Sequence, residues 1–453
     1  AGLGAKVALV ERRFMGGDCL NYGCVPSKGM IRSARTAAEM RRAPEFGIHL
    51  TGKPEVNFTG VMERMRKIRS GISHHDSVER FSEELGIDVF LGEANFVDDS
   101  SVQVGDATLK FKKAVIATGA RPIEPNVPGL KEAGFLTNET LFSITEQPER
   151  MAIVGAGPIG CEMAQTFQRL GTQVTLIDNS DRIFSKEDPD ALDILEETFR
   201  HEGIEIRTGV TLENVSTSNG SKILTLRAGD NTETITVNEI LVGVGRTPNI
   251  ESLGLDAVGV EYNKYGVQVN DRLQTTNKKI FAAGDVCLPY KFTHTADAAA
   301  RIVIQNALFM GRSKVSDLVV PWTTYTEPEI AHVGMYEEEA TEAGIEIQTF
   351  RREMKDVDRA KLDGETVGFV KVITEKGKDK ILGATIVADN AGDMISEITL
   401  AMVGDIGLSK LANVIHPYPT QAEAIKQVGD AFNRTRLTPF VQKLFKKWLA
   451  WTR

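Results

Sequence analysis

The chain has 453 residues, enough for two to four domains, and its 42% hydrophobic and 25% charged residues are ordinary for a soluble globular protein. The formal net charge of −9 argues against a nucleic-acid-binding protein, which normally carries a basic excess. No apolar run approaches the roughly 20 residues that cross a membrane. Four cysteines are too few for a disulfide scaffold, so we expect a cytoplasmic protein in which any disulfide is catalytic.

The chain begins with the second half of a predicted nucleotide-binding unit. Residues 6–10 are predicted to form a buried parallel strand, and Glu11 ends it as the acid that binds ribose hydroxyls in a Rossmann unit. Residues 1–5 are interpreted as the end of a helix. Because the glycine fingerprint normally lies about 20 residues before the acid, we expect about 25 further residues upstream.

A glycine-rich segment with two cysteines follows at residues 16–28, GGDCLNYGCVPSK. Cys19 and Cys24 precede a predicted helix, whose positive N-terminal end lowers a thiol pKa and favours redox chemistry. The alternatives are two structural thiols or half of a metal site, but the spacing does not fit a C-x-x-C zinc knuckle. We interpret Cys161 and Cys287 as buried packing residues.

A second nucleotide-binding unit is complete in the sequence. A strand at 151–154 is followed by a G-x-G-x-x-G fingerprint, a helix at 161–170 and a strand at 173–177. The fingerprint residues are Gly155, Gly157, Pro158, Ile159 and Gly160. Such glycines let the backbone approach a pyrophosphate at the helix N-terminus.

Asp178 directly follows the second strand of this unit. An acid there suits a free ribose 2′-hydroxyl and repels a 2′-phosphate, so we predict NAD(H) in preference to NADP(H). Arg182 lies nearby and could accommodate a phosphate, which keeps NADP(H) as the alternative.

Further strands alternate with loops and then give way to a different pattern. Residues 114–120 and 280–285 are predicted strands that end in Thr-Gly and Gly-Asp. From about residue 321, strands at 368–372 and 381–386 are followed by helical stretches, which indicates a separate α+β domain.

The tail at 431–453 holds six basic residues and no acid. Its apolar residues fall on one face of a predicted helix: Phe440, Val441, Leu444, Phe445, Trp448 and Leu449. This pattern predicts either weak membrane contact by an interfacial helix or packing against the protein's own dimer.

The segment 16–28 resembles the active-site signature of the FAD-dependent pyridine nucleotide-disulfide oxidoreductases, which include dihydrolipoamide dehydrogenase, glutathione reductase and mercuric reductase. The resemblance covers nearly the whole chain. It implies an α/β fold with two Rossmann-like dinucleotide-binding domains and a C-terminal α+β dimerisation domain. The expected segments are an FAD-binding domain at 1–145, an NAD(P)-binding domain at 146–265, a return to the FAD domain at 266–320, a dimerisation domain at 321–430 and the tail at 431–453.

The resemblance also assigns roles to single residues. Cys24 corresponds to the sulfur next to the flavin, whose thiolate forms the charge-transfer complex, and Cys19 to the thiol that meets the substrate. Lys28 corresponds to the lysine beside flavin N5, and Glu162 to its ion-pair partner; the alternative is an exposed ion pair between two helices.

The resemblance also predicts the residues that bind the cofactors. The expected FAD-site residues are Glu11, Gly17, Asp18, Lys28, Thr118, Gly119, Gly284, Asp285 and Thr295. Thr295 is expected to open a helix at 296–308 that points its N–H groups at the flavin pyrimidine, or to act as a simple N-cap. Val210, Gly245 and Arg246 join the fingerprint and Asp178 as expected nucleotide-binding residues.

Near the C-terminus the sequence departs from the commonest family pattern, in which a histidine acts as acid/base from the partner subunit. Alignment on Pro-Thr and on Glu423 places Tyr418 at that position, and His416 lies two residues earlier. A phenol, with a pKa of about 10, is a poor base at neutral pH. Tyrosine here resembles the mercuric reductase-like branch, but no cysteine pair follows Cys287, so efficient Hg(II) turnover is not expected.

These features predict a homodimeric NAD(P)H oxidoreductase that uses FAD and a Cys19–Cys24 disulfide to reduce a small disulfide or thiol-reactive acceptor, with no metal site. The alternative enzyme is a dihydrolipoamide dehydrogenase, with His416 as the base. A third interpretation is a non-catalytic or membrane-associated binding protein that has kept the fold of this flavoprotein family.

Overall fold

The computed structural model describes residues 1–52 and 54–452 and divides the chain into two compact units. Unit 1 holds Ala1–Ser185 and Phe199–Leu318, and unit 2 holds Lys186–Thr198 and Val319–Arg453. Arg453, the last residue of the predicted basic tail, lies outside the described residues. None of the helices in these ranges combines the length and hydropathy needed to cross a bilayer.

The part of unit 1 that carries the cysteine segment, together with residues 246–308, consists of short paired strands rather than one wide sheet. The parallel pairs are β1 (Ala8–Glu11) with β2 (Asp88–Leu91) and β6 (Ala114–Ile116) with β18 (Ile280–Ala282). The antiparallel ones are β3 (Ala94–Asp98), β4 (Ser101–Val104) and β5 (Ala107–Lys110), and β7 (Ala120–Pro122) with β15 (Arg246–Pro248). The helices here are α1 (Gly17–Tyr22), α2 (Cys24–Arg42), α3 (Phe58–Ser73) and α8 (Thr293–Leu308).

The part of unit 1 that carries the second fingerprint is built on a parallel sheet in the order β10-β9-β8-β14. Its strands are β8 (Arg150–Val154), β9 (Gln173–Ile177), β10 (Glu205–Arg207) and β14 (Glu239–Val242), with α6 (Pro158–Leu170) between β8 and β9. An antiparallel sheet adds β11 (Thr211–Ser218), β12 (Ser221–Ala228) and β13 (Asn231–Val237). The central strand β8 is a nearly continuous apolar run because both of its faces are covered; Met151, Ala152 and Ile153 are fully buried.

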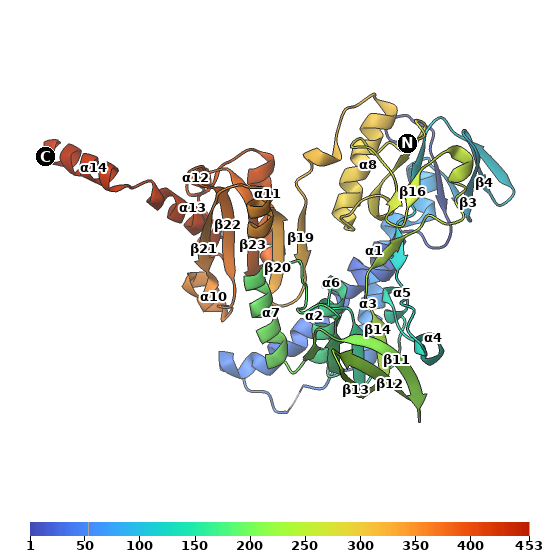
Figure 1. Ribbon diagram of the computed structural model, residues 1–453, viewed down its shortest axis with the longest axis horizontal. Helices are drawn as coiled ribbons and strands as arrows, with labels where there is room; N and C mark the ends of the chain where they lie inside the picture. The colour runs from blue at the N-terminus through green and yellow to red at the C-terminus, as the bar shows by residue number, and fades with distance from the viewer. Residues whose placement is uncertain (53, 453) are drawn as a thin grey trace. The chain divides into compact units, whose positions relative to one another are not determined.

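Unit 2 is built on a five-stranded antiparallel sheet in the order β19-β20-β23-β22-β21 (Figure 1). These strands are β19 (Pro321–Thr324), β20 (Glu329–Gly334), β21 (Ile347–Glu353), β22 (Phe369–Glu375) and β23 (Ile381–Ala388). The helices are α9 (Glu337–Glu342), α10 (Asp358–Asp363), α11 (Ala391–Val403), α12 (Leu408–Leu411), α13 (Glu423–Thr435) and α14 (Pro439–Trp451). This α+β unit agrees with the fold class expected from the sequence.

A short segment that the sequence places within 146–265 joins unit 2. Lys186–Thr198, which includes most of α7 (Pro189–His201), packs with the strands of this unit. Lys371 on β22 is buried and contacts Asp188 at 2.7 Å and Asp190 at 2.8 Å. These ion pairs explain why the segment belongs to unit 2.

Four predicted elements differ from the structure. The strand expected at 280–285 stops at Ala282, and Gly284–Val286 form a turn of 3-10 helix in which Gly284 has a φ of 77°. Residues 1–4 form a turn, closed by the N–H of Gly4 and the carbonyl of Ala1 at 2.7 Å, and not a helix end. The strand expected at 114–120 stops at Ile116, because Gly119 adopts a left-handed φ of 67°. Helix α8 begins at Thr293, so Thr295 lies inside its first turn and does not open it.

Candidate active site

The two cysteines of the glycine-rich segment lie on consecutive short elements. Cys19 is on α1, and Cys24 is the first residue of α2. Gly16 and Gly17, with φ of 86° and 61°, turn the chain from the loop after β1 into α1. Both cysteines are free thiols; Cys19 is half-buried, and Cys24 is exposed at a helix N-terminus. That position stabilises a thiolate through the unpaired N–H groups of the first turn.

A hydrogen bond between the two thiols governs their protonation. It lowers the pKa of Cys19 to about 6, because the Cys24 thiol donates to the Cys19 thiolate. The same bond raises the pKa of Cys24, which keeps the shared proton, and burial acts in the same direction. The family resemblance predicts the thiolate on Cys24, whereas the lower pKa in the structure belongs to Cys19.

A third residue, Thr293, completes the sulfur environment and was missed in the sequence. Its Oγ1 lies 3.7 Å from the Sγ of Cys24, and hydrogen bonding to Thr293 lowers the pKa of both thiols. Thr293 lies at the start of α8, two residues before the predicted Thr295. A hydroxyl residue at the first helical position was the available signal, but the predicted helix began too late to include it.

Lys28 and Glu162 form the expected ion pair. The Nζ of Lys28 on α2 lies 2.8 Å from the Oε2 of Glu162 on α6. The Glu162 side chain is 6% exposed and that of Lys28 is 34% exposed, so the pair is not an exposed surface bridge. It joins the helix that carries Cys24 to the helix that follows the fingerprint.

Arg246 connects two carboxylates of the predicted flavin site. Its Nη1 lies 3.1 Å from the Oδ2 of Asp18, and its Nε lies 3.6 Å from the Oδ2 of Asp285. Burial raises the pKa of Asp285, and the positive charges of Arg246 and Lys291 oppose that rise. Arg246, expected to bind nucleotide, therefore holds the dithiol loop and the Gly284-Asp285 turn together.

The Thr118-Gly119 turn is held by a residue that sequence reasoning missed. The hydroxyl of Thr118 donates to the carbonyl of Asn249 at 2.6 Å, and the side-chain amide of Asn249 donates to the carbonyl of Thr118 at 2.8 Å. Asn249 lies three residues after Arg246, just beyond β15. No local pattern marks it, because its partner is 131 residues away.

Two predicted cofactor-binding residues, Thr295 and Arg246, have buried polar groups that a cofactor would satisfy. Thr295 is 2% exposed, and its Oγ1 has no hydrogen-bond partner among the described residues. The Nε of Arg246 likewise has no hydrogen-bond acceptor there. Buried groups of this kind cost stability unless a ligand or water pairs with them. Glu11 ends β1, and one of its carboxylate oxygens accepts the N–H of Arg13 at 2.8 Å. These residues fit a flavin nucleotide.

The second fingerprint has the geometry of a dinucleotide-binding turn. Gly155 has a φ of 104°, and a Cβ on Gly160 would lie 1.9 Å from the carbonyl oxygen of Gly155. A Cβ on Gly157 would meet open space, and Pro158 and Ile159 at the start of α6 are exposed. The first glycine therefore makes the turn, the last allows close packing, and the middle faces a space where phosphates can approach.

Asp178 follows β9 and contacts the fingerprint loop. Its Oδ2 accepts the N–H of Ala156 at 2.6 Å, and its Oδ1 accepts the N–H of Ser180 at 2.8 Å. Val210 donates its N–H to the carbonyl of Asp178, but its side chain is 6% exposed and belongs to the hydrophobic core. Gly245, with a φ of 117°, forms the turn before Arg246.

The three predicted acid/base residues lie in unit 2. Tyr418 is 71% exposed, and its hydroxyl donates to the Oδ2 of Asp358 at 3.2 Å. This bond raises the pKa of Tyr418, and the negative charges of Asp358 and Glu423 add to the rise. The Nε2 of His416 lies 3.1 Å from both carboxylate oxygens of Glu397, and its side chain is 6% exposed. Tyr418 is therefore free to meet another surface, whereas His416 is held against α11.

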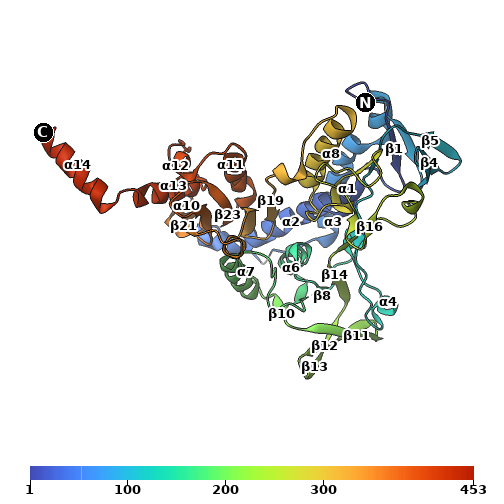
Figure 2. The ribbon, with the colours of Figure 1, turned by 45° about the horizontal axis from the view of Figure 1, so that its top comes forward.

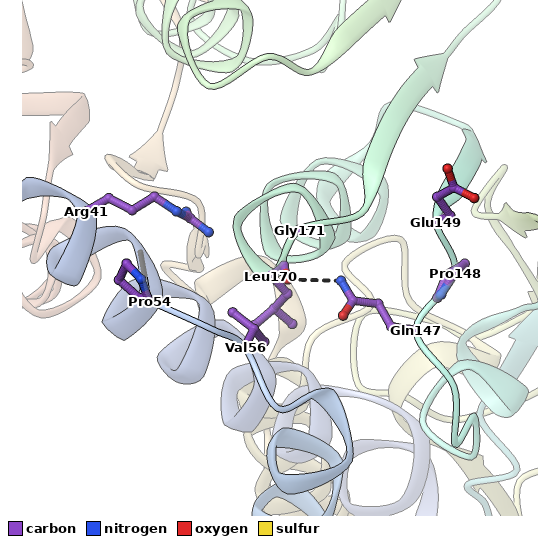
Figure 3. A pocket seen from close by; sticks show the side chains of 8 residues that line it. All are labelled: Arg41, Pro54, Val56, Gln147, Pro148, Glu149, Leu170 and Gly171. Carbon is purple, nitrogen blue, oxygen red and sulfur yellow. Dashed lines mark hydrogen bonds between the residues drawn. The ribbon is translucent and has the colours of Figure 1, made fainter. Parts of the chain in front are cut away.

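Unit 1 also has an open surface pocket of about 350 Å³ (Figure 3). Arg41, Pro54, Val56 and Gln147 are among its lining residues, and the amide of Gln147 donates to the carbonyl of Leu170 at 2.9 Å. None of its lining residues was predicted as a site residue. Within residues 1–52 and 54–452, no cluster of His, Cys, Asp and Glu is arranged to bind a metal ion.

The sequence was compared with known protein families and proteins, and the family it matches contains the features described above. Residues 1–301 match the pyridine nucleotide-disulphide oxidoreductase family, and residues 320–428 match the dimerisation domain of that family. The mercuric reductase of Staphylococcus aureus is 36% identical over 432 residues, which cover 95% of this chain and 79% of the relative. The dihydrolipoyl dehydrogenase of Thermus scotoductus is 32% identical over 451 residues, which cover 96% of this chain and 94% of the relative.

Solved structures agree with this assignment. The HOCl-induced flavoprotein disulfide reductase RclA from Escherichia coli superimposes with a TM-score of 0.85 at 26% identity, covering 95% of each chain. LpdA from Mycobacterium tuberculosis gives a TM-score of 0.86 at 25% identity, covering 94% of each chain. This chain therefore belongs to the FAD-dependent pyridine nucleotide-disulfide oxidoreductase family, as the cysteine segment indicated.

Proposed function

We propose that this protein is an NAD(P)H-dependent reductase in which Cys19 and Cys24 alternate between disulfide and dithiol. The observation that carries the proposal is the Lys28–Glu162 ion pair at 2.8 Å, which joins the cysteine helix α2 to the nucleotide helix α6. FAD, when bound, supplies the step that converts a hydride into an electron pair for the disulfide. Each cycle oxidises one NAD(P)H and, with one proton, converts one acceptor disulfide into two thiols.

In this proposal each residue of the chain has a separate task. Cys24 and Cys19 hold the electron pair as a dithiol, and the Cys19 thiolate attacks the acceptor sulfur or binds a thiol-reactive acceptor. The pKa of Cys19 near 6 makes the attacking thiolate available at neutral pH. Lys28 would contact a bound flavin, and Glu162, 2.8 Å away, holds Lys28 in position. Asp178 favours NAD(H) over NADP(H).

The acceptor class is proposed from the relatives and from Tyr418. Several similar proteins are mercuric reductases, and a solved relative is a disulfide reductase. Tyr418 has a raised pKa, so it donates a hydrogen bond and does not remove protons at neutral pH. We therefore favour reduction of a small disulfide or thiol-reactive compound over oxidation of a dithiol. A thiol cycle of this kind suits a reducing compartment such as the cytoplasm.

Two copies are proposed to pair through unit 2. Residues 320–428 match a dimerisation domain, and unit 2 exposes several large apolar side chains in that range. Among them are Leu400 at 68%, Val403 at 65% and Ile415 at 93% exposed. Burying such residues against a second copy gives an interface near Tyr418.

Turnover assays with the full chain and FAD test the proposal. Oxidation of NADH and NADPH is followed with Hg(II), lipoamide and oxidised glutathione, for the wild type and for Cys24→Ser. We expect acceptor-dependent turnover that falls at least about a thousandfold in Cys24→Ser. Cys287→Ser, a change at a half-buried cysteine outside the pair, serves as the control. Turnover with oxygen or quinone alone, unchanged in Cys24→Ser, would contradict the dithiol mechanism.

A dihydrolipoamide dehydrogenase is the second candidate, favoured by the His416–Glu397 contact and by the Thermus scotoductus relative. If His416 is the base, His416→Ala abolishes lipoamide turnover and Tyr418→His has little effect. If the protein is a reductase with Tyr418 at the acceptor site, Tyr418→His raises lipoamide turnover and His416→Ala leaves it unchanged.

A further inference from the structure

Helix α14 is an amphipathic helix that no part of the described chain covers. Its 13 residues include none that is buried, and it extends away from the sheet of unit 2 in both views (Figures 1 and 2). Phe440, Trp448 and Trp451 are 75%, 59% and 79% exposed. The dithiol chemistry proposed above uses none of these residues.

The helix is specified by its own sequence. The side chain of Thr438 caps the N-terminus by accepting the N–H of Val441 at 3.3 Å, and Pro439 occupies the first turn. A helix of fewer than about 12–15 residues is only marginally stable alone in water. A capped helix of 13 residues without tertiary packing therefore needs a surface on which to bury its apolar side.

The two sides of α14 are cleanly separated. With about 3.6 residues per turn, seven apolar residues share one half of the circumference. We call them the apolar face: Phe440, Val441, Leu444, Phe445, Trp448, Leu449 and Trp451. The other half carries Gln442, Lys443, Lys446 and Lys447, and no acid occurs between 431 and 452. Aromatic residues on one side and lysines on the other are typical of helices that lie in the headgroup region of a membrane.

We propose that α14 binds the surface of an anionic lipid bilayer, with its apolar face in the headgroup and acyl boundary and its lysines at the lipid phosphates. A helix of 13 residues is about 20 Å long and lies in the surface rather than spanning it. A second copy of α14 is disfavoured as the occupant, because it offers the three lysines no negative partner: no acid occurs between 431 and 452, whereas anionic lipids supply phosphates. The family dimerisation domain ends at residue 428, before α14 begins.

Sedimentation of the full chain with lipid vesicles tests this proposal without measuring turnover, so its result is independent of the dithiol mechanism. We expect the protein to bind vesicles of equimolar phosphatidylglycerol and phosphatidylcholine, and to bind pure phosphatidylcholine on the order of tenfold more weakly. Trp448 and Trp451 are two of the three tryptophans, so binding should shift the tryptophan emission to shorter wavelength.

Two variants with the same change in charge separate the faces. Leu444→Glu places a carboxylate on the apolar face and should weaken binding to anionic vesicles roughly a hundredfold. Gln442→Glu places it among the lysines and should weaken binding about fivefold or less. Both should keep the wild-type melting temperature, since α14 packs against nothing in the described chain.

Two outcomes would overturn the proposal. One is an absence of binding to anionic vesicles, or equal losses in Leu444→Glu and Gln442→Glu. The other is a fall in oligomeric state of Leu444→Glu in sedimentation equilibrium, without vesicle binding by the wild type, which would assign α14 to a second copy.

Discussion

The Nζ of Lys28 lies 2.8 Å from the Oε2 of Glu162, although the two residues are 134 positions apart. Lys28 lies one helical turn after Cys24, and Glu162 lies two residues after the last fingerprint glycine. The ion pair thus connects the sulfur end of one helix to the nucleotide end of another. Loss of either charge should affect folding and electron transfer together.

Glu162→Gln should destabilise the protein by about 1–3 kcal/mol, because it leaves the Lys28 charge partly buried without its partner. It should also slow reduction of the disulfide by NADH by about tenfold to a hundredfold, since Lys28 loses its orientation. Urea denaturation and single-turnover absorbance measure the two effects. Glu39→Gln removes a carboxylate from an exposed pair on the same helix, Arg32–Glu39, and should change stability by less than about 1 kcal/mol.

The reduced protein should react with iodoacetamide at Cys19 with a midpoint near pH 6, because the hydrogen bond from Cys24 holds the pKa of Cys19 at about 6. The rate should rise with pH through that value, whereas an ordinary thiol titrates near pH 8.5. The same depressed pKa means that the Cys19 thiolate adds stability above about pH 8.5, and this contribution is lost as the pH falls through 6.

One variant and one further cysteine extend that experiment. Thr293→Val removes a hydrogen bond that lowers the pKa of Cys19 and should move the midpoint upward. Burial raises the pKa of Cys287 to about 12, so Cys287 should stay unmodified throughout. Peptide mass spectrometry assigns the label, and a Cys19 midpoint at pH 8 or above would contradict the prediction.

Asp178→Asn should shift the preference from NADH towards NADPH by roughly tenfold, because it removes a negative charge that repels a 2′-phosphate. The carboxylate also accepts the N–H of Ala156 at 2.6 Å, so the KM for NADH should rise as the fingerprint loop loosens. The ratio of kcat/KM for the two nucleotides measures the shift. Asp181→Asn changes an exposed acid nearby and should leave the ratio unchanged; an equal effect of both variants would argue against a specific role of Asp178.

Lys371→Met should destabilise unit 2 by about 3–5 kcal/mol, because the partner carboxylate of Asp188 is then buried without a counter-charge. The Lys371 and Asp188 side chains are 5% and 4% exposed and lie 2.7 Å apart. Lys376→Met is the matched control, since the Lys376–Glu346 pair is 67% and 79% exposed and should contribute less than about 1 kcal/mol. Thermal unfolding compares the two, and equal shifts in Tm would contradict the argument.

The parts of the site that local sequence pattern encodes were predictable. The turn from Gly155 to Gly160, the helix after it and the α+β character of the C-terminal part follow from residue spacing and apolar periodicity. Lys28 and Glu162 could be paired only through the family resemblance, because no local rule connects residues so far apart.

The remaining parts depend on contacts that the sequence does not record. Helix α8 begins at Thr293 after an apolar N-cap, Phe292, so the usual polar start signal is missing and the residue next to Cys24 was overlooked. Asn249 contacts Thr118, 131 positions away, and Arg246 donates to the carbonyl of Ala120, 126 positions away. Lys186–Thr198 belongs to unit 2 because Asp188 forms a buried ion pair with Lys371. The spacing of apolar residues along the sequence does not reveal such a pair.

The position of Arg246 has an evolutionary consequence. One guanidinium balances Asp18 in the dithiol loop and Asp285 in the turn after β18. A neutral residue in its place would leave two carboxylates uncompensated at once, while a change at either acid would leave a partly buried cation with half of its partners. Drift at these three positions is therefore constrained, and across related chains they should be inherited as a set.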